Sequence, residues 1–257
     1  MKLTVIGCAG SFPGPDSAAS CYLLEAPYEG GTYRLLLDLG SGALGTLQRF
    51  ADLHDIDAVA LSHLHADHCH DICGFYVVSK YHPDGPMARI PVLSPSGTSD
   101  YLAAAYGIED SEGMSEQFDF RPWDTATSQR LGPFDLRAVL VDHPVEAYAI
   151  RVEAEGEVLV YSGDTGPTEV LADLLEGADT FLCEASFVAS RENPPSLHLT
   201  GAEAGEYATR AGVERLLITH IPAWTDRDEV ESDVKTTWGG AYELVVSGSV
   251  HEIGRHP

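Results

Sequence analysis

Three histidines and one aspartate crowd the short run 62–68, which reads SHLHADH. Neutral imidazoles and carboxylates are good ligands for zinc and similar divalent cations. On an extended stretch, His63 and His65 point to the same side and can share one ion, because side chains alternate along the chain. Asp67 and His68 lie past the bend, where they can reach a second ion close to the first. The run therefore predicts a site for two metal ions, and the alternative is a solvated histidine-rich loop.

The segments on either side of this run place it between a strand and a helix. Residues 57–61, which read DAVAL, are typical of a short buried strand. Residues 70–81 carry apolar side chains at roughly helical spacing, among them Ile72, Phe75 and Val78. We therefore expect the metal-binding run on a strand-to-helix loop.

Three more candidate ligands follow predicted strands further along the chain. His143 comes after residues 134–141 and is the candidate for a third imidazole on the first ion. Asp164 stands on a tight turn after residues 158–161, where its carboxylate could bridge two ions; a helix N-cap is the alternative. His220 directly follows another apolar run. Strand ends thus supply a ligand at four places in the chain.

Asp38 ends the apolar run 33–37 and needs a partner if it is buried. The second nitrogen of a metal-binding imidazole would be such a partner, and helix capping is the alternative. Cys69 and Cys73 fall one helical turn apart beside the metal-binding run. We expect them to be buried thiols, with metal ligation as the alternative, because enough histidine and aspartate ligands exist without them.

Glu184 and His198 form a second candidate group. Glu184 ends the short predicted strand 180–183, and His198 stands just before a helix that Thr200 and Glu203 begin with a capping box. His198 therefore lies outside the helix and is free to face a pocket. The alternatives are a helix-entry histidine and a buried, capped glutamate.

Strand-like and helical runs alternate through the whole chain, and we expect one α/β domain over residues 1–257. Residues 107–117 are acidic and predict a surface loop or lid. Trp224 and Trp238 are expected to pack in the core or at its edge, with a platform for substrate as the alternative. The other predicted strands are 3–8, 20–25, 33–37, 90–93, 118–121, 148–153, 242–246 and 250–253, and the predicted helices begin near residues 43, 98, 167, 200 and 226.

The chain is strongly acidic, with a formal net charge of −25 from 40 acidic and 15 basic residues. Such a charge repels nucleic acid and anionic membrane surfaces, so neither is an expected partner, although acid also simply keeps a surface soluble. Five cysteines without a repeating spacing imply no disulfide framework. No signal peptide or membrane-spanning run is evident, and a cytoplasmic location is expected.

The ordered ligand set resembles that of the metallo-β-lactamase fold hydrolases over essentially the whole chain. The resemblance implies an α/β fold of the αββα sandwich type, in which two mixed sheets face each other between outer helices. It implies two divalent metal ions, with zinc expected and manganese or iron as alternatives. It assigns His63, His65 and His143 to the first ion, Asp67, His68 and His220 to the second, and Asp164 to both.

Within that superfamily, the segments around Asp164, Glu184, His198 and His220 resemble the phosphodiesterase branch around ribonuclease Z. That branch has a glutamate and histidine pair, at the positions of Glu184 and His198, that donates a proton to the leaving group. Cys183 stands where ribonuclease Z usually has a histidine. The basic arm that grips tRNA has no room between His143 and Asp164. The whole chain looks most like the atypical class II cyclic-AMP phosphodiesterases of actinobacteria.

The resemblance implies hydrolysis of 3′,5′-cyclic nucleotides, with cyclic AMP expected, by attack of a metal-bridging hydroxide on phosphorus. Asp67, Glu184 and His198 are the expected catalytic residues. The partner is a small phosphodiester, and relatives commonly form homodimers. Three alternatives stay open: a tRNA 3′-processing endonuclease, a thioester or lactone hydrolase, and a metal-binding regulatory protein without turnover.

Overall fold

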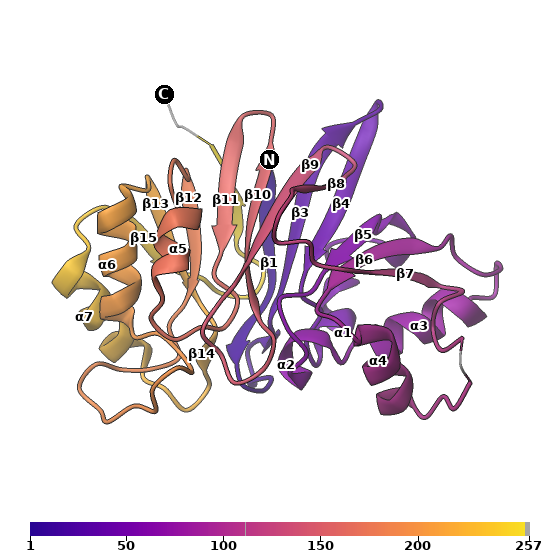
Figure 1. The fold of residues 1–257 in the computed structure, drawn as a ribbon, viewed down its shortest axis with the longest axis horizontal. Coiled ribbons are helices and arrows are strands. Elements are labelled where there is room, and N and C mark those ends of the chain that lie inside the picture. The colour runs from indigo at the N-terminus through magenta and orange to yellow at the C-terminus, as the bar shows by residue number, and fades with distance from the viewer. Residues whose placement is uncertain (111, 255–257) are drawn as a thin grey trace.

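The computed structural model describes residues 1–110 and 112–254, and their strands form two sheets (Figure 1). The first has the strand order β14-β1-β3-β4-β5-β6-β7, with β2 and β16 also paired to β1. Its strands are β1 (Lys2–Gly10), β2 (Ala18–Ala19), β3 (Cys21–Tyr28), β4 (Gly31–Leu37), β5 (Ala58–Ala60), β6 (Ile90–Ser94), β7 (Phe118–Pro122), β14 (Ile221–Pro222) and β16 (Val250–Glu252). The second sheet has the order β15-β13-β12-β11-β10-β9-β8. Its strands are β8 (Gln129–Leu131), β9 (Phe134–Leu140), β10 (Tyr148–Ala154), β11 (Glu157–Tyr161), β12 (Thr180–Glu184), β13 (Arg215–Thr219) and β15 (Ala241–Leu244).

Most of the helices lie on the outer faces of the two sheets, at opposite sides of the molecule, whereas the short helix at Ala66–Cys69 lies near the strand ends between them (Figure 1). Four belong to the first half of the chain: α1 (Ala43–Leu47), α2 (Ala66–Cys69), α3 (Ile72–Tyr81) and α4 (Thr98–Tyr106), with a short 3₁₀ helix at Leu53–Asp55. Three belong to the second half: α5 (Glu169–Leu174), α6 (Gly201–Ala211) and α7 (Arg227–Thr237). In the described residues no helix is both long and apolar enough to span a bilayer.

Three apolar cores hold these layers together. Between the sheets, side chains such as Val5 from β1 and Ile150 from β10 share one fully buried cluster. A second core joins the second sheet to α5, α6 and α7, and a third joins the first sheet to α1, α3 and α4. The packing is therefore helix, sheet, sheet, helix, and the predicted αββα sandwich is confirmed.

Strand direction decides where the chemistry lies. β4 runs parallel to β5, and β11, β12 and β13 run parallel to one another. β9 has the same direction as β11, because both are antiparallel to β10. The residues that follow these strands therefore lie at the same end of the strands in each sheet. Polar side chains from distant parts of the sequence can meet there.

Most predicted elements are present, with small differences at their ends. The helix predicted to begin at Pro167 begins at Glu169, with Thr168 as its N-cap. The predicted capping box on α6 is present. Short strands β2, β8 and β14 were not predicted. The predicted loop 107–117 includes Ser111, which lies outside the described residues.

Candidate metal centre

The seven predicted ligand residues meet where the strands of the two sheets end. The His63 to His68 run leaves β5, and α2 carries Asp67 and His68. The other three follow strands of the second sheet: His143 after β9, Asp164 after β11 and His220 after β13. Two groups result, each with possible ligand atoms within 4.8 Å of one another, and Asp164 belongs to both.

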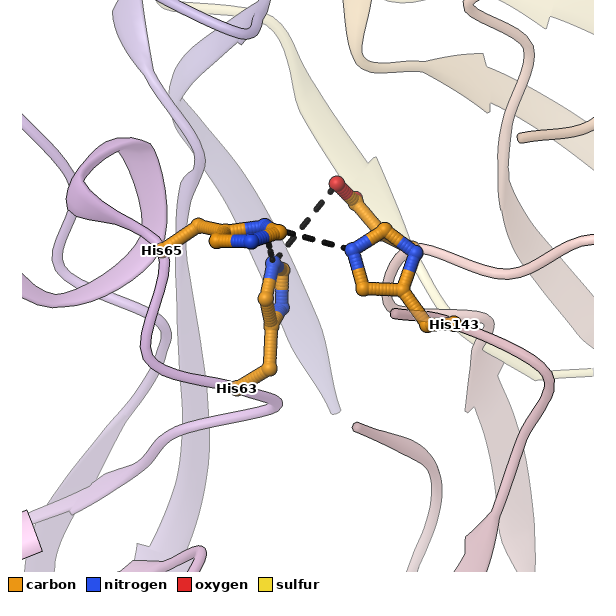
Figure 2. Close-up of side chains that lie close together, drawn as sticks. His63, His65 and His143 are labelled. Atoms are coloured by element: carbon orange, nitrogen blue, oxygen red, sulfur yellow. Dashed lines mark hydrogen bonds and ion pairs between the residues drawn. The ribbon is translucent and has the colours of Figure 1, made fainter. Parts of the chain in front are cut away.

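The first group holds His63, His65, His143 and Asp164. Figure 2 shows the three imidazole rings turned toward a common point. His65 Nδ1 lies 3.0 Å from His63 Nε2 and 3.2 Å from His143 Nε2. The Asp164 carboxylate lies 3.7 Å from His63 Nε2. Three imidazole nitrogens and one carboxylate oxygen thus face one small volume.

The second group holds Asp67, His68, Asp164 and His220, and all four side chains are buried. The Nε2 atoms of His68 and His220 each lie 3.2 Å from an Asp164 oxygen. The Asp67 carboxylate lies 3.5 Å from His68 Nε2 and 3.7 Å from His220 Nε2. Asp164 faces both groups, as a bridging ligand must.

Two observations test whether these groups fit a divalent metal. Two ligands of one tetrahedral zinc ion, each about 2.1 Å from it, lie about 3.4 Å apart, which matches the spacings above. His68 Nε2, His220 Nε2 and Asp164 Oδ1 are also buried without a protein hydrogen-bond partner. Leaving a buried polar atom unsatisfied costs about 1–3 kcal/mol. The residues therefore fit metal ions, and their roles as ligands stay predictions.

The second ring nitrogen of several of these histidines is held by a neighbouring group. His143 Nδ1 lies 3.0 Å from the Leu197 carbonyl oxygen, to which it donates. His220 Nδ1 lies 2.9 Å from Ser20 Oγ, and His68 Nδ1 lies 2.7 Å from Asp38 Oδ2. Such contacts fix the ring orientation and present Nε2 to the centre.

Asp38 is fully buried and serves more than one donor. Besides His68, its carboxylate accepts hydrogen bonds from the Ser62 backbone N–H at 2.6 Å, from Ser62 Oγ at 2.8 Å and from the Tyr161 hydroxyl at 2.8 Å. The predicted contact between Asp38 and an imidazole is present. Asp38 therefore joins the metal-binding run to the second sheet.

The backbone takes unusual conformations around the centre. Asp38 has a φ of 59° and His220 a φ of 55°, in the left-handed region that side chains other than glycine rarely adopt. Gly163, beside Asp164, has a φ of 57°, and a Cβ there would press on the Tyr148 carbonyl oxygen. Strained residues persist where the surrounding structure enforces them, and they gather at functional sites.

The electrostatics differ between the two groups. Burial lowers the pKa of His63, His65 and His143, so these rings are neutral at pH 7, which is the form that binds metals. Burial also opposes a charged His68, yet the Asp164 and Asp38 carboxylates raise its pKa well above the usual value. The second group thus concentrates negative charge that favours a cation.

Glu184 and His198 form a hydrogen-bonded pair beside Asp164. His198 Nδ1 lies 2.9 Å from Glu184 Oε1 and 3.8 Å from Asp164 Oδ2. Glu184 is fully buried and also accepts the Thr165 backbone N–H at 2.9 Å. Burial lowers the pKa of His198, but the Glu184 carboxylate outweighs this and raises the pKa to about 9. The ring is therefore a positively charged imidazolium at neutral pH. The predicted pair is therefore formed, next to the metal ligands.

Sequence reasoning missed some residues around the site. Tyr161 and Ser20 are ordinary strand residues in the sequence, and only the tertiary fold shows that Ser20 contacts the predicted ligand His220 and that Tyr161 donates to Asp38. Trp224 does not pack in the core: its exposed fraction is 67%, and it lines a cavity next to His198. Cys69 is buried, and neither it nor Cys73 belongs to a ligand group among the described residues.

Comparison with known proteins identifies the family. Residues 33–221 match the model of the beta-lactamase superfamily domain. Uncharacterized protein ML1173 of Mycobacterium leprae is 47% identical over 98% of this chain and 89% of its own length. Probable metallo-hydrolase YhfI of Bacillus subtilis is 33% identical over 98% of this chain and all of its own. The YhfI crystal structure superposes with a TM-score of 0.86 over 98% of this chain and 99% of that chain.

A ribonuclease Z of Mycobacterium bovis is 27% identical over 100% of this chain and 99% of its own. The match to the family model covers most of the chain, and the relatives align from end to end. Their names include a metallo-hydrolase and a ribonuclease. The fold, the two histidine and aspartate groups and these relatives agree: the chain belongs to the beta-lactamase superfamily and is a metal-dependent hydrolase.

Proposed function

We propose that this chain is a phosphodiesterase that uses two divalent metal ions to hydrolyse 3′,5′-cyclic nucleotides, with cyclic AMP the expected substrate. The observation that carries the proposal is the Glu184 and His198 pair at the edge of the ligand groups. Similarity to a ribonuclease Z, a hydrolase of phosphodiesters by its name, supports the same reaction class.

His63, His65 and His143 would hold one ion, Asp67, His68 and His220 the other, and Asp164 both. Zinc is the expected metal, and imidazole and carboxylate sites also accept manganese or iron. When bound, such ions lower the pKa of water and polarise a phosphoryl oxygen. The chain's own part is to fix the ligands and to handle the leaving group.

His198 suits the leaving group of a phosphodiester. That group departs as an alkoxide, which is strongly basic and needs a proton as the bond to phosphorus breaks. Glu184 engages Nδ1 of His198, which leaves Nε2 to donate that proton. A thiolate departs without help because its conjugate acid has a pKa near 8.5, so a thioesterase gains little from such a pair. The pair thus favours a phosphodiesterase over a thioesterase.

Charge favours a small substrate over a folded RNA. The formal net charge is −25, and proteins that grip RNA neutralise its phosphates with lysine and arginine. A tRNA endonuclease remains the second candidate, because a ribonuclease Z aligns over the whole chain.

Metal analysis coupled to a substrate panel tests the proposal. The panel holds 3′,5′-cyclic AMP, 3′,5′-cyclic GMP, a linear dinucleotide, a precursor tRNA and a thioester. We expect two bound ions per chain and the highest kcat/KM on a cyclic nucleotide. A higher kcat/KM on precursor tRNA or the thioester contradicts the proposal, and so does full metal occupancy without turnover.

His198→Ala tests the proton donor. We expect kcat on cyclic AMP to fall by about 10²–10⁴-fold, with the metal content unchanged, because His198 is not a predicted ligand. His82→Ala is the matched control, since this half-buried histidine lies at the end of α3, away from both ligand groups. Unchanged kcat in His198→Ala, with metals retained, would remove the assigned role.

A further inference from the structure

A cavity of about 340 Å³ opens directly beside His198. One wall comes from the segment after β12 and includes Phe187, whose ring lies 5.1 Å from the His198 ring in an edge-to-face arrangement. Pro222 and Trp224 also line the cavity. The cavity lining therefore combines His198, the proposed proton donor, with two aromatic side chains.

Trp224 is the most exposed of the large hydrophobic side chains in the described residues, at 67%. It is not a loose side chain, because its ring lies 4.7 Å from the ring of Phe12, at an angle of 37°. Phe12 is itself 37% exposed. We call these two residues the aromatic ledge. Trp224 lines the cavity and Phe12 packs against Trp224 from outside its lining, and exposed aromatic surfaces of this kind are typical of binding sites.

Strands β1 and β14 of the first sheet position the aromatic ledge close in sequence to the predicted ligand His220. Strands β1 and β14 are parallel neighbours, with Gly10 opposite Pro222. Phe12 and Trp224 each follow their strand after one intervening residue, so the two rings leave the sheet edge at the same level. His220 stands immediately before β14. One short pair of strands therefore positions both the metal ligand and the aromatic ledge.

We propose that the aromatic ledge stacks on the heteroaromatic base of a nucleotide substrate, while the phosphodiester lies at the ligand groups and its leaving oxygen faces His198. This inference rests on the proposed phosphodiesterase activity and names the part of the substrate that the site recognises. Every nucleobase has a flat π face, so stacking would accept more than one base.

The charge of the cavity supports stacking as the means of recognition. Besides the protonated His198, its charged lining residues are Arg191 and Glu192, which have opposite signs, and Arg191 already pairs with Glu229 at 2.6 Å. The wall therefore offers little net positive charge to hold further phosphates. Binding energy beyond the phosphodiester itself must come mainly from apolar and π contact, which Trp224 and Phe187 supply in the cavity, with Phe12 packed against Trp224.

Two matched substrates separate base recognition from phosphodiester chemistry. One is 3′,5′-cyclic AMP, and the other is methyl ribofuranoside 3′,5′-cyclic phosphate, which lacks a base. For Trp224→Ala we expect kcat/KM on cyclic AMP to fall roughly 5- to 150-fold, mostly through KM, with kcat/KM on the base-free compound unchanged. Phe12→Ala should act in the same direction, and Trp224→Phe should restore most of the loss.

Tyr81→Ala is the control, because Tyr81 is 63% exposed at the end of α3 and lines no part of this cavity. Equal losses on both substrates in Trp224→Ala, or no loss on either, would overturn the inference. A second readout is quenching of tryptophan fluorescence by AMP, which we expect in the wild-type protein and, much reduced, in Trp224→Phe.

The two readouts keep the inference apart from the proposed function. If the wild-type protein hydrolyses no phosphodiester but AMP quenches fluorescence only when Trp224 is present, the proposed function fails and the base-binding ledge stands. If the wild type hydrolyses cyclic nucleotides, but Trp224→Ala and Phe12→Ala have the wild-type kcat/KM on both substrates, the inference about the aromatic ledge fails and the proposed function stands. Absence of both turnover and quenching overturns both.

Discussion

Asp38 shows how one side chain can organise a metal centre without belonging to it. Its buried carboxylate accepts hydrogen bonds from Ser62, Tyr161 and His68. Of these, His68 is a predicted ligand, and Ser62 directly precedes another, His63. A substitution at Asp38 would therefore displace predicted ligands of both groups.

We expect Asp38→Asn to lower metal affinity by about 10–100-fold, because an amide nitrogen cannot accept the hydrogen bond from His68 Nδ1. Competition with a chelator measures this affinity. Asp179→Asn is the control: Asp179 is a buried aspartate that accepts the Val158 backbone N–H, at the opposite end of β12 from Glu184. Wild-type affinity in Asp38→Asn, with the fold intact, would show that His68 needs no such partner.

The sequence predicts which residues belong to this site, but it does not predict which of them contact one another in the folded chain. A buried aspartate demands a partner, so an imidazole contact for Asp38 follows from the sequence. Which histidine fills that place depends on how the chain folds back from β4 to α2. Trp224 shows the opposite case: a tryptophan is usually buried, but this one follows the two-residue strand β14 and lies exposed at a cavity.

At the level of elements, the pattern that could be predicted is an apolar run that stops at a polar residue. Strands β5, β11 and β13 each end shortly before a candidate ligand, and apolar runs alone locate them. Strands β2 and β14 have two residues each, too few for any alternation to appear. Their existence depends on β1 lying beside them, which no local pattern encodes.

Close approach between elements also constrains glycines. Gly40 follows β4, and a Cβ on it would collide with the backbone oxygen of Asp67 in α2. We expect Gly40→Ala to lower the free energy of unfolding by about 1–3 kcal/mol and to weaken metal binding, because α2 must move to make room. Chemical denaturation and metal analysis measure the two effects.

Gly45→Ala is the matched control for that substitution. Gly45 lies in α1, exposed, with nothing within 4 Å of the added Cβ. Alanine is the better helix former, so we expect Gly45→Ala to gain about 0.5–1 kcal/mol and to bind metal as the wild type does. Equal behaviour of the two variants would mean that α2 does not need its close contact with β4.

At the scale of the whole molecule, the two candidate ligand groups lie between two sheets that are held together by apolar packing and by hydrogen bonds such as that from Tyr161 to Asp38. His63, His65, Asp67 and His68 come from the first sheet and its loops, and His143, Asp164 and His220 follow strands of the second. Each ligand group contains residues from both halves. Bound ions would therefore cross-link the sandwich at the edge where the strands end.

Metal removal should consequently destabilise the whole fold. A ligand that binds only the folded state, at 100 times its dissociation constant, adds about 2.7 kcal/mol of stability. For a chain of this size that corresponds to a fall in Tm of about 5–10 °C for each ion that a chelator strips. Differential scanning calorimetry measures the shift, and adding back zinc, manganese or iron should reverse it. Asp164→Asn, which weakens both ligand groups, should start from the lower Tm and respond little to the chelator. A wild-type Tm that the chelator leaves unchanged, in protein shown to have lost its ions, would mean that the two sheets need no metal to stay together.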